Sequence, residues 1–230
     1  MPTWNSLSFM GRLSAPAQQA LLRLGASKTL QRNDILVRQG EADTTVYLML
    51  SGRMNITVTV ENGSQSLLGI RHAGDLVGEM AMLGQERVRS ATVTARERST
   101  VLVLRPDPFR KYLAAYPEAP LAMGGLISHR LDQANTYRAD AAGYDVEVRL
   151  ARALLYQARR LARREHGTLM VELLQSELAM LIGAKETTVQ KAMSRPALGP
   201  LVMCQRGKVF LLDVPALARV AEIEVPGELR

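Results

Sequence analysis

The sequence predicts an α+β protein in three parts: an antiparallel β-roll over residues 1–113, one long helix over 114–143, and a helix-turn-helix with a β-hairpin over 144–230. Three observations lead to this prediction. The first half consists of short apolar runs separated by turn residues, and the middle is rich in alanine and leucine at helical spacing. The last third contains two short helical segments around the pair Gly183-Ala184.

Length and composition are those of an ordinary globular protein, with 230 residues, 47% hydrophobic and 22% charged. No apolar run is long enough for a signal peptide or a membrane-spanning helix, so we expect a cytoplasmic protein with no membrane partner. The single cysteine, Cys204, excludes an internal disulfide. The net charge of +7 suits a nucleic-acid partner, but the surplus is +5 in residues 1–113 and +3 in 144–230, so charge alone locates no DNA-binding domain.

The β-roll is predicted from Asp34 to Leu104, where β-prone runs alternate with turn residues. The run MNITVTV alternates between apolar and polar residues, and the Asn62-Gly63 pair that follows it is a strong hairpin signal. The stretch from Gly78 to Leu83 interrupts this rhythm with helix-forming residues. A helical excursion inside a β-roll usually serves a site, so we expect function there.

A long helix is predicted from about Glu118 to Ala141, because Pro120, the proline within that run, stands near its start. Residues at three- and four-residue steps form a narrow, partly apolar stripe that includes Leu121, Ile127 and Leu131. A long helix between two domains often packs on its symmetry mate, which predicts a homodimer through these residues. The alternative is a helix that packs on its own β-roll.

The last part is predicted to begin with a helix that follows Gly143. Its last turns are expected to carry four arginines, namely Arg159, Arg160, Arg163 and Arg164. These side chains either approach DNA phosphates or form a solvated face that complements the helix dipole. The following residues predict a helix, a tight turn at Gly183-Ala184, a second helix and a hairpin with Gly207 in its turn, which is the order of a winged helix-turn-helix.

The most specific chemistry lies in the segment from Gly78 to Ser90. The start of a short helix after Gly78 supplies backbone N–H donors for a phosphate. Arg89 adds a planar fork of donors and Ser90 adds a hydroxyl, while Glu79 is suited to accept a hydrogen bond from a ribose hydroxyl. Without further context, the same residue types also fit a surface cluster or an internal salt bridge.

Several short motifs occur together in a fixed order along nearly the whole chain. They are Gly40-Glu41, Gly52, Gly74-Asp75, Gly78-Glu79 with Arg89-Ser90-Ala91, Asp145 with Arg149, and Glu177-Leu178-Ala179 through Gly183-Ala184. In this order they resemble the Crp/Fnr family, the catabolite-activator-like bacterial transcription regulators. Each motif alone is weak, and the order is what makes the resemblance specific.

The resemblance implies a homodimeric, DNA-binding transcription regulator controlled by a cyclic nucleotide in the β-roll, with cyclic AMP favoured over cyclic GMP. It implies a parallel pair of central helices and a partner in double-stranded DNA, expected as a pseudo-palindromic operator, with RNA polymerase as a candidate further partner. The ligand-binding residues that follow from it are Gly78, Glu79, Met80, Arg89, Ser90 and Asn135.

The central helix departs from the family pattern where the base of the nucleotide is read. Two neighbouring hydroxyl residues read adenine in the cyclic AMP receptor, and here Ala134 and Asn135 stand in their place. Asn135 either offers hydrogen bonds to a purine edge or pairs with its twofold mate and sets the register of the two helices. The identity of the base therefore stays open.

The DNA-reading helix also departs from the family pattern. The Ser-Arg-Glu-Thr-Val run that is common in the family is Lys185-Glu186-Thr187-Thr188-Val189 here. Lysine therefore replaces the usual Ser N-cap, and glutamate replaces the arginine that contacts guanine. The residues expected to contact DNA are Lys185, Glu186, Thr187, Thr188, Gln190 and Lys191. Pro196 should end the helix near Arg195, because proline inside a helix costs about 3 kcal/mol. These changes predict an altered sequence preference or weakened DNA binding.

Other classes of protein fit less well. The three histidines, His72, His129 and His166, and Cys204 show no spacing typical of an axial haem pair or a metal site, so we expect neither group. Phosphate-loop and nucleophile-elbow motifs are missing from the sequence, so we do not expect an enzyme. The remaining alternative is a nucleotide-binding or ligand-free dimer whose winged helix makes protein contacts, which Glu186 and Pro196 motivate.

Overall fold

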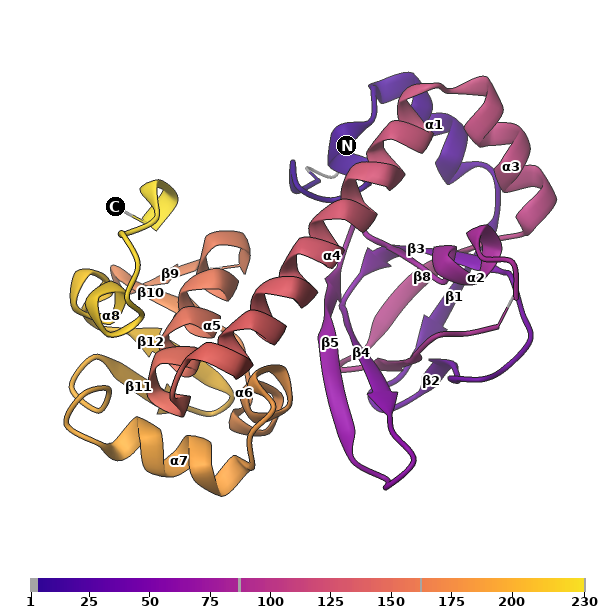
Figure 1. The fold of residues 1–230 in the computed structure, drawn as a ribbon. Helices are drawn as coiled ribbons and strands as arrows, with labels where there is room; N and C mark the ends of the chain where they lie inside the picture. Colours follow the sequence, from indigo (N-terminus) through magenta and orange to yellow (C-terminus); the bar gives the residue numbers. More distant parts are fainter. Residues whose placement is uncertain (1–3, 87, 162, 230) are drawn as a thin grey trace. The chain divides into compact units, whose positions relative to one another are not determined.

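The computed structural model describes residues 4–86, 88–161 and 163–229, and its chain divides into two compact units, 1–132 and 133–230 (Figure 1). The long helix α4 (Glu118–Gly143) contributes to both units. The two units are described separately below. Within the described residues, no helix combines the length and the hydropathy needed to cross a membrane.

The first unit contains two four-stranded antiparallel sheets, with strand orders β1-β8-β3-β6 and β2-β7-β4-β5. The first sheet is made of β1 (Ala26–Leu30), β3 (Val46–Ser51), β6 (Leu76–Val77) and β8 (Ser99–Leu104). The second is made of β2 (Ile35–Val37), β4 (Arg53–Thr59), β5 (Gln65–His72) and β7 (Thr92–Ala95). The helices of this unit, besides the first half of α4, are η1 (Met10–Arg12), α1 (Ala15–Leu22), α2 (Glu79–Leu83) and α3 (Pro106–Ala115).

The predicted hairpin is confirmed between β4 and β5. The amide of Val60 donates to the carbonyl of Ser64 at 3.0 Å, and Gly63 adopts a left-handed φ of +80° that glycine accepts without strain. Along β4, Met54 and Ile56 are buried while Arg53, Asn55 and Thr57 are half-buried, as the alternating pattern predicts. The excursion between strands is also confirmed, since α2 begins at Glu79.

Two apolar clusters form the core of the first unit. One lies where α1, α3 and the first half of α4 pack on the β-roll, and it includes the fully buried Phe9, Phe109 and Leu48. The other includes Met49, Met54 and Val101 from the two sheets. Leu76 and Met82 belong to the first cluster and Val77 to the second, so the core holds both sides of the turn between β6 and α2.

The long helix runs from Glu118 to Gly143, close to the predicted 118–141. In its first half, Ala122, Met123 and Leu126 are buried in the core of the first unit. The alternative that this helix packs on its own β-roll therefore holds for that face. It does not hold for Leu121 and Leu131, which are 77% and 59% exposed.

The second unit combines helices with one four-stranded antiparallel sheet of order β11-β12-β10-β9. Besides the end of α4, its helices are α5 (Val146–Leu161), α6 (Gln175–Ile182), α7 (Glu186–Ser194), α8 (Val214–Val220) and η2 (Gly227–Leu229). Its strands are β9 (Arg163–Glu165), β10 (Thr168–Val171), β11 (Val202–Gln205) and β12 (Lys208–Leu211). Since α6 and α7 precede the β11–β12 hairpin, the α+β class and the winged helix-turn-helix are confirmed.

One local prediction for this unit was wrong. Arg163 and Arg164 were expected in the last turns of a helix, but α5 ends at Leu161 and both arginines lie on β9. The reason is the pair His166 and Gly167, whose φ angles of +50° and +83° form a tight reversal that pairs β9 with β10. The predicted basic cluster is therefore divided between a helix and an edge strand.

Candidate ligand site and nucleic-acid interface

The turn from β6 into α2 depends on Gly78. Its φ of +86° is in the left-handed region, and a Cβ added there would lie 2.5 Å from Nη1 of Arg89 and 2.8 Å from the carbonyl oxygen of Thr45. Both contacts are shorter than van der Waals distance. Gly78 therefore allows the guanidinium of Arg89 to lie against the backbone of two other segments.

Arg89 is almost completely buried, with 3% of its surface exposed. Its Nη1 donates to the carbonyl oxygen of Gly78 at 3.0 Å, and its Nη2 donates to the carbonyl oxygen of Thr45 at 2.8 Å and to Oδ2 of Asp43 at 2.6 Å. A guanidinium carries five N–H donors, so this arrangement is strongly bonded and still leaves donor capacity. Arg89 therefore forms an internal salt bridge, but its partner is Asp43, which the sequence analysis did not consider.

Asp43 lies in the segment between β2 and β3, and its carboxylate is held on both sides. Oδ1 accepts from the amide of Thr45 at 2.9 Å and from its hydroxyl at 2.8 Å, while Oδ2 faces Arg89. Burial alone would raise the pKa of Asp43, but the hydrogen bonds from the Thr45 amide and from Arg89 outweigh it and hold the pKa below its ordinary value. The carboxylate is therefore charged near neutral pH.

Glu79 is the second charged residue at this turn, and it is 2% exposed. Its Oε1 accepts from Nη1 of Arg130, which lies on α4, and Nη2 of Arg130 donates to the carbonyl oxygen of Leu76 at 2.7 Å. The other carboxylate oxygen, Oε2, is buried and has no hydrogen-bond partner among the described residues. A buried acceptor without a donor is costly, so this atom is a natural place for a ligand hydroxyl.

The other predicted ligand residues are less enclosed. Met80 is 50% exposed and Ser90 is exposed beside Arg89. Asn135 is exposed on the part of α4 that belongs to the second unit, where its Oδ1 accepts from Arg138 at 3.3 Å. Arg87, which precedes this pair of residues on the same segment, lies outside the described residues.

Two residues at this turn were missed by sequence reasoning, namely Asp43 and Arg130. Asp43 is 46 residues from Arg89 in the sequence, and Arg130 is 51 residues from Glu79. No periodicity connects residues that far apart. Burial of Glu79 and Arg89 would have been an indirect signal, because buried charges require partners of opposite charge, but the sequence did not predict that these two residues are buried.

The three residues predicted at the dimer interface differ in their surroundings. Leu121 and Leu131 are 77% and 59% exposed in the isolated chain, whereas Ile127 is partly buried against the core of the first unit. Gly124, between the two leucines, is also exposed, and a Cβ added there would meet no atom within 4 Å. Leu121, Gly124 and Leu131 thus form an exposed stripe, which we call the α4 stripe.

The helix-turn-helix is built from α6, a turn at Gly183 and α7. Gly183 ends α6 with φ +64° and ψ +43°, the left-handed conformation that glycine accepts at a helix end. Val189, Ala192 and Met193 are the buried face of α7. The predicted DNA contacts lie on the other face, where Lys185, Glu186, Thr187, Gln190 and Lys191 are exposed and Thr188 is half-buried.

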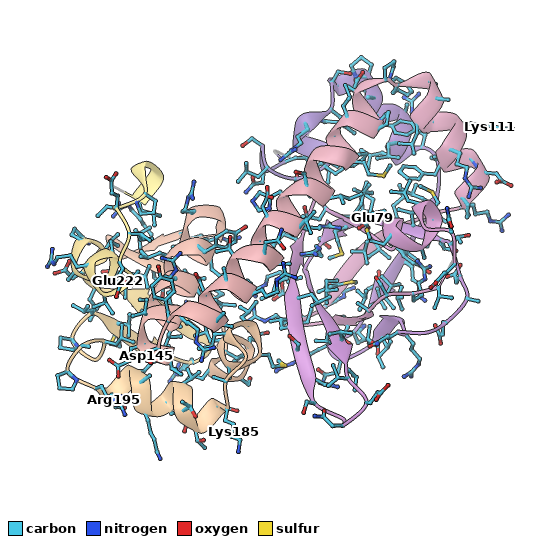
Figure 2. All side chains as sticks on the ribbon, viewed as in Figure 1. Glu79, Lys111, Asp145, Lys185, Arg195 and Glu222 are labelled. Atoms are coloured by element: carbon cyan, nitrogen blue, oxygen red, sulfur yellow. The ribbon has the colours of Figure 1, made fainter. Side chains whose placement is uncertain are left out.

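The end of α7 agrees with the prediction made from Pro196. The helix stops at Ser194, and Arg195 has extended backbone angles, as expected for the residue before a proline. Arg195 pairs with Glu147 of α5 at 2.6 Å, and its side chain is 66% exposed. In Figure 2, Lys185 and Arg195 mark the two ends of α7.

A shallow hollow of about 550 Å³ follows the exposed face of α7. It is lined by Thr187, Gln190, Lys191, Ser194 and Arg195. Three of these were predicted to contact DNA, whereas Ser194 and Arg195 were not. Two cations and three hydrogen-bonding side chains along α7 and the residue that follows it provide what phosphate and base-edge contacts require.

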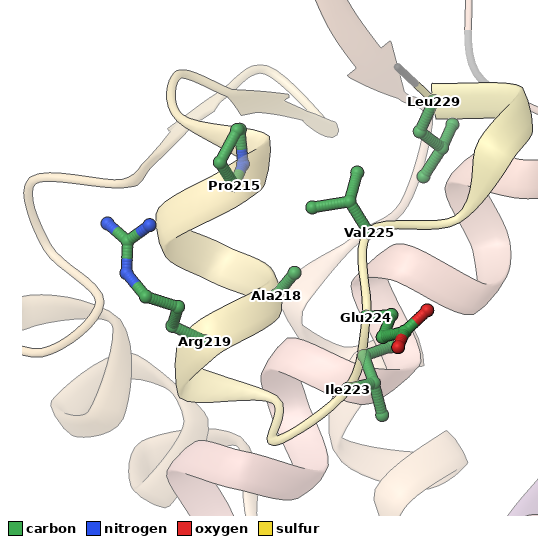
Figure 3. A pocket seen from close by; sticks show the side chains of 7 residues that line it. All are labelled: Pro215, Ala218, Arg219, Ile223, Glu224, Val225 and Leu229. Atoms are coloured by element: carbon green, nitrogen blue, oxygen red, sulfur yellow. The ribbon is translucent and has the colours of Figure 1, made fainter.

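A second hollow, of about 650 Å³, lies between α8 and the C-terminal segment (Figure 3). It is lined by Pro215, Ala218, Arg219, Ile223, Glu224, Val225 and Leu229. Most of this lining is apolar, and it contains none of the residues predicted to bind ligand or DNA. The hollow therefore does not correspond to either predicted site.

The sequence matches two protein families, one in each half of the chain. Residues 27–116 match the family described as "Cyclic nucleotide-binding domain", and residues 148–220 match "Crp-like helix-turn-helix domain". A CRP-like cAMP-activated global transcriptional regulator of Mycobacterium tuberculosis is 31% identical over 192 residues, which are 83% of this chain and 85% of that protein.

Solved structures show the same fold. A CRP/FNR-family transcriptional regulator from Thermus thermophilus has a TM-score of 0.69 at 24% identity, covering 86% of this chain and 98% of that one. The c-di-GMP-responsive global regulator CLP of Xanthomonas campestris has a TM-score of 0.73 at 19% identity, covering 87% and 100%.

A cyclic nucleotide-binding domain and a Crp-like helix-turn-helix on one chain define a CRP-like transcription regulator, a class that is not enzymatic. With the 31% identity to the mycobacterial regulator, the chain belongs to the Crp/Fnr family.

Proposed function

We propose that this regulator is a homodimer whose DNA binding is controlled by a cyclic nucleotide, cyclic AMP in preference to cyclic GMP, bound at the turn between β6 and α2. The domains in this proposal are residues 1–113 for the ligand, 114–143 for dimerisation and 144–230 for DNA. The observation that carries the ligand assignment is the buried Oε2 of Glu79, an acceptor with no donor among the described residues, close in the fold to a buried arginine.

The residues at this turn fit a cyclic nucleotide. Glu79 Oε2 accepts from the ribose hydroxyl, and the remaining donors of Arg89 together with the exposed Ser90 bind the cyclic phosphate. Arg130 pairs with Oε1 of Glu79, which leaves Oε2 for the ligand. The name of the mycobacterial relative, which describes it as cAMP-activated, supports the choice of nucleotide.

The base is proposed from Asn135 and from the name of the mycobacterial relative. The c-di-GMP-responsive regulator of Xanthomonas shares this fold, so the fold alone does not select cyclic AMP. Asn135 offers both a donor and an acceptor to a purine edge, and it is exposed on α4. In this proposal Asn135 contacts the base, and Met80 with Gly78 contributes backbone to the phosphate.

The α4 stripe supports the homodimer. Leu121 and Leu131 expose apolar side chains on a helix that contributes to both units, and burying each of them against a symmetry mate removes apolar surface from water. Ile127 lies at the edge of this contact, because it is partly committed to its own core. Two parallel copies of α4 would bring two DNA-reading helices onto one duplex.

The DNA partner in this proposal is a pseudo-palindromic operator. A twofold dimer places its reading helices in successive major grooves, about one helical turn or roughly 34 Å apart. Lys185, Lys191, Thr187, Thr188 and Gln190 make the contacts, and Glu186 accepts from a cytosine amino group or stays clear of the backbone. A regulator bound in this way has RNA polymerase as a further candidate partner.

A second candidate function is a ligand-sensing dimer whose winged helix makes protein contacts with weakened DNA binding. The exposed acidic Glu186 at the first turn of α7, and the short nine-residue helix that Pro196 limits, favour it. Binding to random genomic DNA fragments, measured against salt concentration, separates the two. A steep fall with salt indicates phosphate contacts, and no binding at low salt favours the second function.

Calorimetric titration of the full chain with cyclic AMP and cyclic GMP tests the ligand assignment. The expected result is saturable binding of one nucleotide per chain, tighter for cyclic AMP. Absence of heat and of any thermal shift with either nucleotide at millimolar concentration contradicts the assignment while leaving the fold unaffected.

A further inference from the structure

The position beside Arg89 already holds an anion, the carboxylate of Asp43. Oδ2 of Asp43 lies 2.6 Å from Nη2 of Arg89, which is the separation of a strong charge-assisted hydrogen bond. The Arg89 side chain is 2% exposed, whereas that of Asp43 is 44% exposed. The pair therefore consists of a fixed, buried cation and a carboxylate that reaches it from the solvent side.

The carboxylate is placed there by its own local structure. The amide and hydroxyl of Thr45 both donate to Oδ1 of Asp43, at 2.9 and 2.8 Å, so that only Oδ2 is directed at the guanidinium. Arg89 does not depend on Asp43 for its own orientation. It also donates to the carbonyl oxygens of Thr45 and Gly78, which fix the plane of the guanidinium from the backbone.

We propose that Asp43 is an intramolecular competitor of the ligand phosphate, which lowers the affinity of the site and selects ligands of low negative charge. This inference rests on the proposed function, because it concerns the phosphate of the same nucleotide. A second anion that approaches Arg89 meets a carboxylate at contact distance. It must either displace Asp43 or tolerate like-charge repulsion in a partly desolvated place.

The selection follows from the charge of the phosphate. A cyclic phosphate is a diester with one negative charge. A 5′-monophosphate carries about 1.5 to 2 negative charges near neutral pH. Arg89 and Asp43 together are neutral, so the pair gives a ligand anion no net attraction. The repulsion between Asp43 and the ligand increases with the negative charge on the ligand. Asp43 therefore disfavours 5′-AMP more than cyclic AMP. The acceptor for the ribose is unaffected, since Oε2 of Glu79 has no partner among the described residues.

The test compares three full-length proteins by calorimetry at one salt concentration, namely the unaltered chain, Asp43→Asn and Glu41→Gln. Asparagine keeps the shape of the side chain and an acceptor but removes the charge. Glu41 is a matched control, because it is an exposed carboxylate close in sequence whose side chain accepts from the amide of Arg38 and not from Arg89. Cyclic AMP and 5′-AMP are the two probes.

For Asp43→Asn we expect cyclic AMP to bind about tenfold more tightly, and 5′-AMP to gain by a larger factor, since a contact like-charge repulsion is removed. Glu41→Gln should change both by less than about twofold, as expected for a screened surface charge. Thr45→Val, which removes one of the hydrogen bonds that hold Asp43, should tighten cyclic AMP binding by a smaller factor and serves as a second variant.

Two results would overturn the inference. If the unaltered chain binds cyclic AMP and Asp43→Asn binds it equally or more weakly, Asp43 positions Arg89 and does not compete, while the proposed function stands. If none of the variants binds either nucleotide, the proposed effector and the competitor role are both lost. Thermal unfolding of each protein is measured beside its titration, so that loss of binding can be distinguished from loss of folding.

Discussion

The proposed ligand site and helix α7 hold their charged groups in opposite ways. In the first unit, the side chains of Arg89 and Arg130 are 2% and 16% exposed, and each is bound to a carboxylate. Lys191 on α7 is exposed, and Arg195, which directly follows α7, keeps a side-chain exposure of 66% although it pairs with Glu147. The first arrangement is preorganised and costly to disturb, and the second rearranges easily.

This difference sets how each site should respond to its partner. A ligand at the buried site must either bind beside the existing ion pairs or displace one of their carboxylates. Its affinity should therefore depend on geometry and charge, and only weakly on salt concentration. Contacts from exposed cations to DNA should depend steeply on salt, because they release counterions. The variants below test these two expectations, from the largest effect to the smallest.

The largest effect is expected for Arg130→Met. It removes the partner of Glu79, which is 2% exposed, and leaves a buried charge without compensation. Breaking such a pair costs about 3–5 kcal/mol, so the free energy of unfolding should fall by that order in urea denaturation. The double variant Arg130→Met/Glu79→Gln should recover most of the loss, and an equal loss in both proteins would contradict the burial argument.

Arg89→Leu should abolish nucleotide binding, raising the dissociation constant by about 100-fold or more, because the phosphate loses its buried cation. The same change leaves the carbonyl oxygens of Thr45 and Gly78 without their donor, so stability should also fall, by about 1–3 kcal/mol. Calorimetry and thermal unfolding measure the two effects. Arg38→Leu, an exposed arginine of the same unit, is the control and should affect neither.

Leu131→Asp should dissociate the dimer, since it places a carboxylate near its twofold mate inside an apolar contact. Leu131 is 59% exposed in the single chain, so the monomer should fold as before. Analytical sedimentation at micromolar concentration measures the change. Leu68→Asp replaces another exposed leucine, on β5, and should leave the dimer intact. An unaltered protein that sediments as a monomer would remove the interface proposal.

Lys191→Ala should weaken operator binding by about 1–3 kcal/mol if the lysine contacts a base, and should relax the preference at one position of each half-site. A lysine that contacts only phosphate should weaken all sequences alike and reduce the salt dependence. Competition binding with substituted duplexes distinguishes the two. Lys111, exposed on α3 of the first unit and labelled in Figure 2, supplies the control Lys111→Ala.

The smallest effect is expected for Glu147→Gln, which releases Arg195 from its ion pair at the end of α7. The Arg195 side of the pair is largely exposed and Glu147 is half-buried, and solvent-accessible pairs contribute roughly 0.2–1 kcal/mol. Binding to non-specific duplex should therefore tighten by about twofold and show a slightly steeper salt dependence. Weaker binding after this change would mean that the pair positions α7 and does not compete for phosphates.

Local signals predicted much of the fold. Alternation along β4 and the Asn62-Gly63 turn gave a hairpin where one is found, and Pro196 predicted the end of α7. The failures were also local. Arg163 and Arg164 fit a helix as well as they fit an edge strand, and the reversal at His166-Gly167 decided between the two.

The candidate site was predictable only in part. The residues of the turn were identified from Gly78, Glu79 and Arg89, but their partners Asp43 and Arg130 are distant in sequence and carry no pattern of their own. Which internal group neutralises a buried charge is decided by tertiary packing. Asn135 belongs to the second unit, so packing within the first unit does not determine whether its side chain reaches a ligand at that turn.

The most direct test is the affinity of the full-length protein for a duplex selected from random sequences, measured by fluorescence anisotropy as cyclic AMP is added. The unaltered protein should change its affinity with a midpoint at the calorimetric dissociation constant, and Arg89→Leu should show no change at any concentration. If neither cyclic AMP nor cyclic GMP alters the affinity of the unaltered protein for the selected duplex, nucleotide control of DNA binding is contradicted.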